Sequence, residues 1–218
     1  MATVETTPLR ENRFRLSDID WSSYKAIANA IGERHVRLTY DRGNLEFMTI
    51  SYEHERWNEL LGQFIVVLTE ELDMPRQSAG STTFDREDLA RAVEPDRCYY
   101  LANAPLMRDK EQIDLTIDPP PDLALEIEIS RSLLNRLGIY AAMGVPEVWR
   151  FDGDELQVLL LAEAGRYVES DRSRAFPFLL LSEVLRFLRQ RSTVDETTLV
   201  RSFRQWVREQ IARAWQAS

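Results

Sequence analysis

The segment from Pro121 to Ser130, PDLALEIEIS, constrains the fold more than any other part of this sequence. Its apolar and acidic residues alternate, and a period of two predicts a β-strand because successive side chains point to opposite faces of a sheet. One face would carry Leu123, Leu125, Ile127 and Ile129. The opposite face would carry Ala124, Glu126, Glu128 and Ser130. The run Pro119–Pro121 cannot belong to a central strand, so the strand begins after it.

The two glutamates on one strand face need an explanation. Neighbouring carboxylates repel each other, and each resists removal from water. Such a face can be solvated, paired with arginine, or occupied by a divalent cation, of which magnesium suits a few carboxylates with water retained. From this segment alone the solvated face is the favoured interpretation, because half-buried sheets commonly turn charged residues outward.

A second acidic position strengthens the cation hypothesis. Asp96, in the triplet Glu94-Pro95-Asp96, precedes another strand-like stretch and lies 30 residues before Glu126. Acids at the start of one strand and within a neighbouring strand could converge on one ion. Phosphodiester hydrolysis uses a cation in this way, to lower the pKa of the attacking water and to neutralise developing negative charge.

The rest of the chain predicts alternating helices and strands. Periodicity and turn residues indicate helices over 17–31, 53–72 and 133–143, and strands over 36–40, 45–49, 76–84, 97–101, 122–130, 147–151, 156–162 and 167–169. Ser17 would cap the first helix, and Asp41-Arg42-Gly43-Asn44 indicates a hairpin. The expected fold class is α/β (α+β), with a lead-in over 1–16, one domain over 17–190 and an amphipathic C-terminal helix within 191–218.

Net charge and cysteine content limit the expected binding partners and cellular location of the protein. The net charge is −9 over 218 residues, which argues against non-specific nucleic-acid binding, although a local basic patch can outweigh the global sum. Cys98 is the sole cysteine, so no intramolecular disulfide forms, and the N-terminus does not resemble a signal peptide. No apolar run approaches the roughly 20 residues of a membrane span. We therefore expect a cytoplasmic protein with no membrane partner.

The sequence lacks the motifs required for nucleotide binding, zinc binding and serine hydrolase catalysis. The sequence has neither a GxxxxGK[ST] phosphate loop nor a GxGxxG dinucleotide motif. His35, His54 and Cys98 are too few and too scattered for a standard zinc site. No GxSxG nucleophile elbow is present.

Five stretches resemble a known family in their order along the chain. They are YDRGNLEFMTISYEHE, GSTTFDRED, VEPDRCYYL, DPPPDLALEIEIS and LNRLGIYAAMGVPEVWRFDGDEL, from Tyr40 to Leu156. They resemble the signature blocks of the Uma2-type (DUF820) family of restriction endonucleases. The resemblance implies a PD-(D/E)XK nuclease-like fold, with a restriction-endonuclease-like mixed central sheet flanked by helices, here followed by a C-terminal helical extension. It also implies magnesium or manganese as cofactor.

The resemblance also implies roles for individual residues. Asp96 matches the proline–aspartate acid and Glu126 the acid of the (D/E)XK element, both metal ligands in related nucleases. Glu128 stands where the standard motif has lysine. Many members instead carry a lysine four residues before the tyrosine of the next helix, and counting back from Tyr140 gives Arg136.

Arginine at this position changes the expected chemistry. A guanidinium is effectively always protonated, so Arg136 can hold a phosphate oxygen but cannot act as a general base. In an active site, Glu128 or a metal-bound hydroxide would handle the proton, with Arg136 as an electrostatic clamp. Two further residues start the long helix. Glu55 is either an additional metal ligand or a first-turn acid that favours the helix dipole, and His54 is expected to make a structural hydrogen bond.

Three functions follow as hypotheses. The first is a metal-dependent endonuclease with Asp96, Glu126, Glu128 and Arg136 in its active site, acting on nucleic acid, with DNA as the expected partner. The alternative is a catalytically degenerate nuclease-fold module that binds nucleic acid or protein, suggested by the missing lysine. The C-terminal helix could also join two copies in a homodimer, unless its apolar face covers its own domain.

Overall fold

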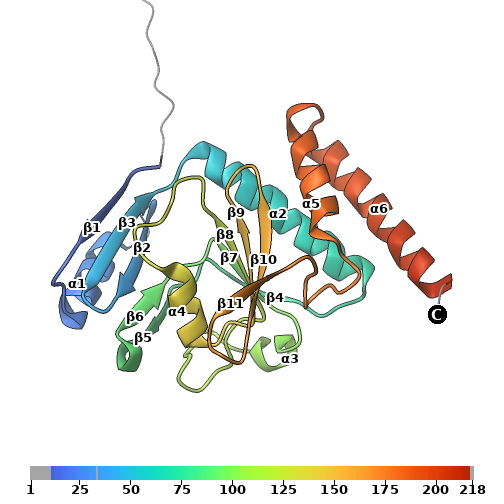
Figure 1. Cartoon of the computed structure of the whole chain (residues 1–218). Coiled ribbons are helices and arrows are strands. Elements are labelled where there is room, and N and C mark those ends of the chain that lie inside the picture. Colours follow the sequence, from blue (N-terminus) through green and yellow to red (C-terminus); the bar gives the residue numbers. More distant parts are fainter. Residues whose placement is uncertain (1–10, 33, 217–218) are drawn as a thin grey trace, which may run out of the picture.

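The computed structural model describes residues 11–32 and 34–216 and contains two β-sheets with helices packed around them (Figure 1). The larger sheet has six strands in the order β11-β10-β9-β8-β7-β4. Its strands are β4 (Gln77–Gly80), β7 (Arg97–Tyr100), β8 (Leu123–Ile127), β9 (Glu147–Phe151), β10 (Leu156–Leu161) and β11 (Tyr167–Ser170). β8 and β9 are parallel and the other neighbours are antiparallel, so the sheet is mixed, as predicted.

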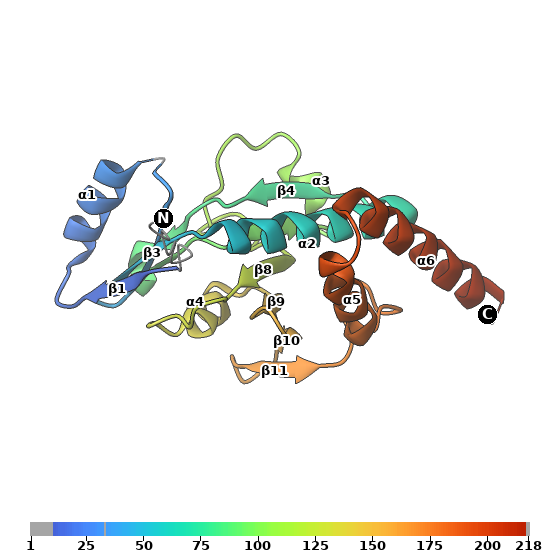
Figure 2. The same ribbon diagram turned by 90° about the horizontal axis from the view of Figure 1, so that it is seen from above.

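The predicted strand of alternating residues is β8, in the middle of this sheet. Leu123, Leu125 and Ile127 pack against α2 (Tyr52–Glu71), while Ala124 packs against α4 (Arg136–Met143). Figure 2 shows the two helices on opposite sides of β8. Because α4 covers the acidic face, Glu126 is only 7% exposed, and the expectation of a solvated face is wrong for this residue.

The smaller sheet has five strands in the order β1-β3-β2-β6-β5, all antiparallel. They are β1 (Arg13–Leu16), β2 (Val36–Asp41), β3 (Asn44–Thr49), β5 (Phe84–Arg86) and β6 (Arg91–Val93). The predicted hairpin joins β2 to β3, with positive φ at Arg42 (46°) and Gly43 (88°), as a type I′ turn requires. Part of the predicted lead-in forms the edge strand β1, and residues 1–10 lie outside the described residues.

The first helix, α1 (Trp21–Ile31), packs Tyr24 against Tyr40 of β2 with ring centroids 4.8 Å apart. It begins later than predicted, because Asp20 and not Ser17 is its N-cap: the Asp20 carboxylate accepts the Ser23 N–H at 2.7 Å. The helix predicted over 133–143 likewise begins at Arg136, capped by Asn135. The remaining short elements are α3 (Ala104–Met107) and the 3₁₀ turns η1 (Glu87–Leu89) and η2 (Arg189–Ser192).

Of the two C-terminal helices, the longer one packs on α2 and the shorter one contacts β10 of the larger sheet (Figure 1). They are α5 (Leu181–Leu188) and α6 (Glu196–Gln216). Leu199, Phe203 and Val207 of α6 are fully buried, and Arg204 and Arg208 pair with Glu71 of α2 at 2.8 Å. The predicted amphipathic helix is therefore confirmed, and the buried part of its apolar face covers its own domain, while Trp206 and Ile211 are only partly buried. Within the described residues, no helix combines the length and apolar character of a membrane span.

Phe203 gives a direct test of this packing. Its ring stacks on Phe64 of α2 at 4.1 Å. Phe203→Leu should lower the free energy of unfolding by about 1–2 kcal/mol, because leucine loses the aromatic contact and leaves part of the ring volume empty. Urea denaturation measures the change, with Arg201→Ala on the exposed side of α6 as the matched control. Equal midpoints for the two variants would contradict the packing.

Candidate active site

Asp96 and Glu126 lie side by side where the two sheets meet. The Asp96 N–H donates to the Leu125 carbonyl oxygen at 3.2 Å, and its Oδ2 accepts the Ile127 N–H at 2.7 Å. These two bonds fix the Asp96 carboxylate against β8, next to Glu126. The residues are 3% and 7% exposed. The structure thus brings together the two acids that the sequence singled out.

Glu126 is fully engaged by α4. Arg136 donates from Nε to Oε2 at 2.9 Å and from Nη2 to Oε1 at 2.6 Å, and the Tyr140 hydroxyl also donates to Oε1. The same guanidinium donates to Thr39 Oγ1 of β2 at 2.5 Å and to the Glu94 carbonyl oxygen at 2.8 Å. Arg136 therefore bridges α4, β8 and the smaller sheet, and it carries the positive charge closest to Glu126.

Asp96 Oδ1 is the one carboxylate oxygen of the pair that accepts no hydrogen bond from the residues that the structure describes. It faces the His54 Nε2 and the Arg37 Nε, each at 3.2 Å, but neither contact has hydrogen-bond geometry. Arg37 is held by Glu94, with Nη1 2.6 Å from Oε1. The structural hydrogen bond expected for His54 is thus an ion-pair contact with Asp96.

The surroundings shift the pKa values of these groups. Burial alone would lower the pKa of His54, but the adjacent Asp96 carboxylate outweighs burial and holds that pKa above the ordinary 6.5. Burial would likewise raise the pKa of Asp96, yet contact with His54 and Arg37 brings it below 3.8. Burial and the Glu126 charge raise the pKa of Tyr140 well above 10, so its hydroxyl stays protonated and donates.

The His54 titration is directly testable. We expect the pKa of His54 to lie above 6.5 in the native protein and to fall in Asp96→Asn, which removes the attracting charge. Because the folded-state pKa exceeds the unfolded one, protonated His54 stabilises the fold below pH 6.5, and this stabilisation is lost as the pH rises through the folded-state pKa. Imidazole NMR checks this, with His35→Gln to assign the signals; an unchanged pKa in Asp96→Asn would refute the ion pair.

Glu128 and Glu55 lie further from the pair. Glu128 follows the end of β8, where its Oε1 accepts the Ser132 N–H at 3.0 Å and its Oε2 lies 3.5 Å from Arg150 Nη1. The Glu55 side chain is half exposed, with Oε1 3.5 Å from His54 Nδ1, so the His54 ring separates it from Asp96. Its role as a metal ligand stays a prediction.

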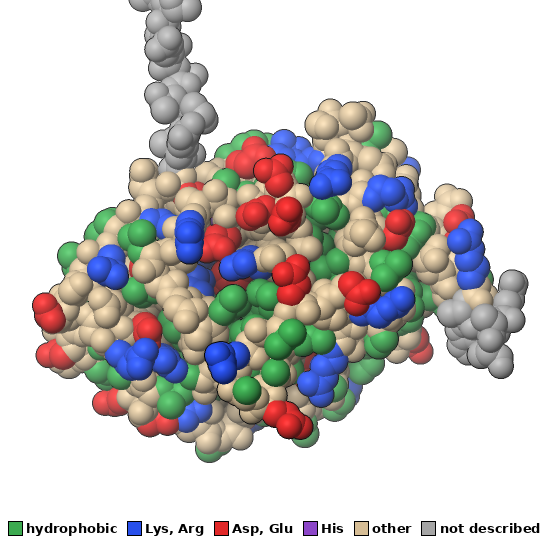
Figure 3. All heavy atoms as spheres, in the orientation of Figure 1, with side chains coloured by type: hydrophobic (Ala, Val, Ile, Leu, Met, Phe, Trp, Pro, Cys, Tyr) green, Lys and Arg blue, Asp and Glu red, His purple; other side chains and the backbone are tan. Residues whose placement is uncertain are grey.

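A cavity of about 350 Å³ opens beside Glu126, between the ends of β8 and β9 and the start of α4. Its walls include Glu126, Glu128, Arg131, Arg136 and Arg150. Three arginines against two glutamates make this lining locally positive on a protein whose net charge is −9. Figure 3 shows acidic and basic side chains interleaved over the face seen in Figure 1, without a continuous basic stripe. The positive charge on this face is therefore confined to local arginine clusters.

A second buried network orders the loop after β8, and sequence reasoning missed it. Glu46 of β3 is 1% exposed; it accepts from Arg13 Nη1 at 2.8 Å, from Ser132 Oγ at 3.0 Å and from the Leu133 N–H. Glu11 accepts the Ser130 N–H at 2.9 Å. Each partner lies at least 33 residues away in the chain, so no local pattern could have indicated the network.

The donor set can be compared with what a divalent cation needs. Magnesium demands near-octahedral oxygen ligation, commonly through one or two carboxylates and several waters. Here both Glu126 oxygens are taken by Arg136 and Tyr140, and the free Asp96 oxygen faces two cationic groups. Within residues 11–32 and 34–216, no three His, Cys, Asp or Glu side chains converge as a metal site. While Arg136 holds Glu126, these residues do not fit a divalent cation.

The mixed sheet flanked by helices, with buried acids at its central strands, defines a nuclease-like α/β domain. The family model Uma2, described as a putative restriction endonuclease, matches residues 21–194. The chain therefore belongs to this family, and the resemblance found in the sequence is confirmed. No curated protein matches the sequence.

Proposed function

We propose that this chain is an endonuclease that hydrolyses phosphodiester bonds, with DNA as its substrate. The observation that carries the proposal is the buried pair of Asp96 and Glu126 beside a cavity lined by three arginines. Nuclease-like function is supported by membership of the Uma2 family. Phosphodiester substrates are anionic, and arginine binds phosphate oxygens through its planar fork of donors.

Each residue at the cavity has a proposed task. Arg131, which is exposed, and Arg150 would contact phosphate oxygens. Glu128 would accept the proton of the attacking water, since Arg136 cannot. Magnesium or manganese is the proposed cofactor, with Asp96 and Glu126 as its ligands and Glu55 as a further candidate. Because Arg136 occupies Glu126, that ligand set requires the guanidinium to leave first.

One observation favours a second function. Arg136 also bonds to Thr39 and the Glu94 carbonyl oxygen, as expected of a permanent structural element. A chain in which this arrangement never opens would be a catalytically degenerate module that binds nucleic acid or protein. The alternative keeps the arginine-lined cavity as a binding site and gives up hydrolysis.

Cleavage of supercoiled plasmid with millimolar magnesium or manganese separates the two functions. The endonuclease proposal expects cleavage by wild type, loss of it in Asp96→Asn, and no loss in Asp154→Asn, an exposed acid on the β9–β10 turn. Circular dichroism confirms that each variant is folded. If folded wild type cleaves nothing and gains no thermal stability from either metal, the endonuclease proposal fails and the binding module is supported.

A homodimer in the cytoplasm completes the proposal. Enzymes that cut both strands of a duplex can do so by pairing two sites, and a two-fold dimer is the commonest oligomer. Trp206 and Ile211 of α6 are only partly buried in one chain, which leaves apolar surface at that helix. Multi-angle light scattering measures the mass in solution, and a monomer mass at assay concentration would remove the dimer.

A further inference from the structure

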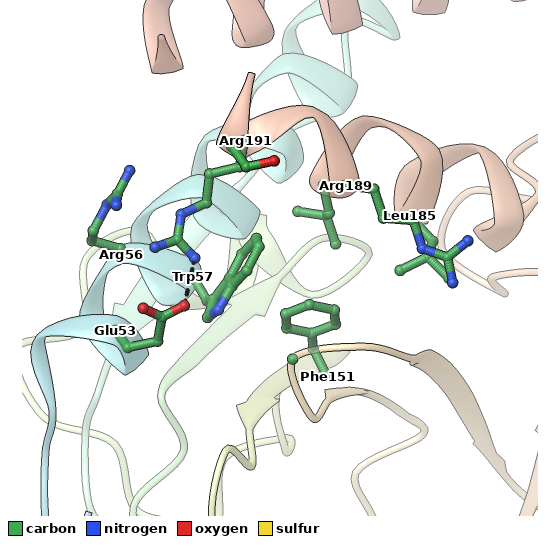
Figure 4. Close-up of a pocket in the computed structure, with 10 residues that line it drawn as sticks. Glu53, Arg56, Trp57, Phe151, Leu185, Arg189 and Arg191 are labelled. Carbon is green, nitrogen blue, oxygen red and sulfur yellow. Dashed lines mark hydrogen bonds and ion pairs between the residues drawn. The ribbon is translucent and has the colours of Figure 1, made fainter. Parts of the chain in front are cut away.

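A second cavity, of about 310 Å³, lies between the start of α2, the β9–β10 turn and η2 (Figure 4). The close-up shows Glu53, Trp57, Phe151 and Arg191 close together, with Arg56 and Arg189 on opposite sides of this group. Those that carry the argument are Glu53, Arg56, Trp57, Phe151, Arg189 and Arg191. None of them takes part in the pair of Asp96 and Glu126.

The cavity has an aromatic wall that is held in place. The Trp57 and Phe151 rings meet edge to face, with centroids 4.9 Å apart, and Phe151 is buried. The Arg191 guanidinium lies 3.9 Å from the Trp57 ring centroid, and its Nη1 is 3.0 Å from Glu53 Oε1. Because Arg191 is fixed by both contacts, its charge is oriented before any ligand arrives.

The lining is more positive than the protein around it. Three arginines and one glutamate line the cavity, while the whole chain carries −9. Arg56 is partly neutralised by Glu196 at 3.2 Å. Arg189 is exposed and, among the residues that the structure describes, has no acidic partner within ion-pair distance. This combination of an aromatic wall and an unpaired arginine suits a ligand with both a planar ring and an anionic group.

The cavity adjoins the candidate active site through two elements. On α2, Glu53 directly precedes His54, whose ring contacts Asp96. On β9, Phe151 directly follows Arg150 of the first cavity, and its carbonyl oxygen accepts the Glu128 N–H at 2.8 Å. The two cavities therefore lie at the same end of β8 and β9 but on opposite faces of the larger sheet, the first on the α4 face and the second on the α2 face.

We propose that this second cavity binds one unpaired nucleotide of the nucleic-acid strand that enters the candidate active site. The base would pack against the accessible part of Trp57, and the phosphate would contact Arg189. The inference rests on the proposed function and adds a substrate class to it. A base can reach an aromatic wall only outside a duplex, so the preferred substrate is single-stranded or locally unpaired.

Binding of a labelled 12-nucleotide deoxythymidine strand tests the proposal. Arg189→Glu should weaken binding about tenfold or more, because it reverses a charge at the phosphate contact. Arg201→Glu on the exposed side of α6 makes the same charge change elsewhere and should leave the Kd nearly unchanged. The strand should also quench tryptophan fluorescence in wild type, and Trp57→Phe should remove most of that quenching. A matched duplex should bind more weakly than the single strand.

The possible outcomes distinguish failure of this inference from failure of the proposed endonuclease function. If wild type binds the strand but Arg189→Glu behaves like Arg201→Glu, the second cavity is not a subsite, while the proposed function stands. If wild type binds no nucleic acid at all, both fail. Free thymidine monophosphate that binds as tightly as the strand would identify a mononucleotide site and overturn the strand proposal. An oligoglutamate peptide that competes equally would overturn nucleotide recognition.

Discussion

Glu126→Ala is expected to lower the free energy of unfolding by about 3–5 kcal/mol, the cost of leaving a buried charge without its partner. The Arg136 side chain is 12% exposed, and Glu126 is its only acidic partner within ion-pair distance among the described residues. Two charge-assisted bonds disappear with the carboxylate. Urea denaturation monitored by circular dichroism gives the difference from wild type.

Two controls identify the unpaired charge as the cause. Glu128→Ala removes a more exposed glutamate whose arginine contact is 3.5 Å long, and should cost less than about 1 kcal/mol. The double variant Glu126→Leu with Arg136→Met removes both charges and should recover a large part of the lost stability. If Glu126→Ala costs no more than Glu128→Ala, Arg136 does not depend on Glu126 in the way its geometry indicates.

Arg136→Lys should give a larger response to divalent cations than wild type shows. An ammonium group donates from a single point and cannot hold both oxygens of a carboxylate as a guanidinium does. One Glu126 oxygen would then be released beside the free Asp96 Oδ1. With metal at about 100 times its Kd, the folded state gains about 2.7 kcal/mol by mass action. The thermal midpoint in magnesium or manganese measures this gain, and plasmid cleavage should rise with it.

The carboxylates supply the control for this variant. Adding Asp96→Asn to Arg136→Lys should abolish both the thermal shift and the gain in cleavage, because one ligand is lost. Calcium at equal ionic strength distinguishes a selective site from general screening of charge. If Arg136→Lys is folded and does not respond to metal, Asp96 and Glu126 do not form a cation site even when freed, and the binding module becomes the better proposal.

The sequence predicted those features whose cause is local. Alternation identified β8, helical periodicity identified α2 and α6, and the Asp41–Asn44 turn identified the β2–β3 hairpin. The proximity of Asp96 to Glu126 was also predicted, from their positions on neighbouring strands and from the family resemblance. β6 was not predicted because three residues are too few to show a period. The bond from Arg136 to Glu126 was missed because it depends on how α4 lies across β8, which periodicity does not specify.

The contacts around Asp96 could not be predicted from the sequence for the same reason. Arg37 reaches the site from the smaller sheet, 59 residues before Asp96, and His54 reaches it from α2. His54 was expected to be structural, but the position of its partner could not be known from a single sequence. Glu46 follows the same rule, since its burial is set by a loop that begins after β8. Sequence patterns describe the neighbours of a residue along the chain. The ionic partners of these charged residues are far away in the sequence and come close only in the folded structure.

The guanidinium of Arg136 also links the two sheets, since it donates hydrogen bonds to Glu126 of β8 and to Thr39 of β2. Breaking the ion pair between Arg136 and Glu126 is therefore expected to weaken the contact between the two sheets. When a ligand binds Arg136 in place of Glu126, amide hydrogen exchange in β2 and β8 should accelerate together. This is expected even if the ligand contacts neither strand. In this protein, opening the site and relaxing the scaffold are expected to be one and the same motion.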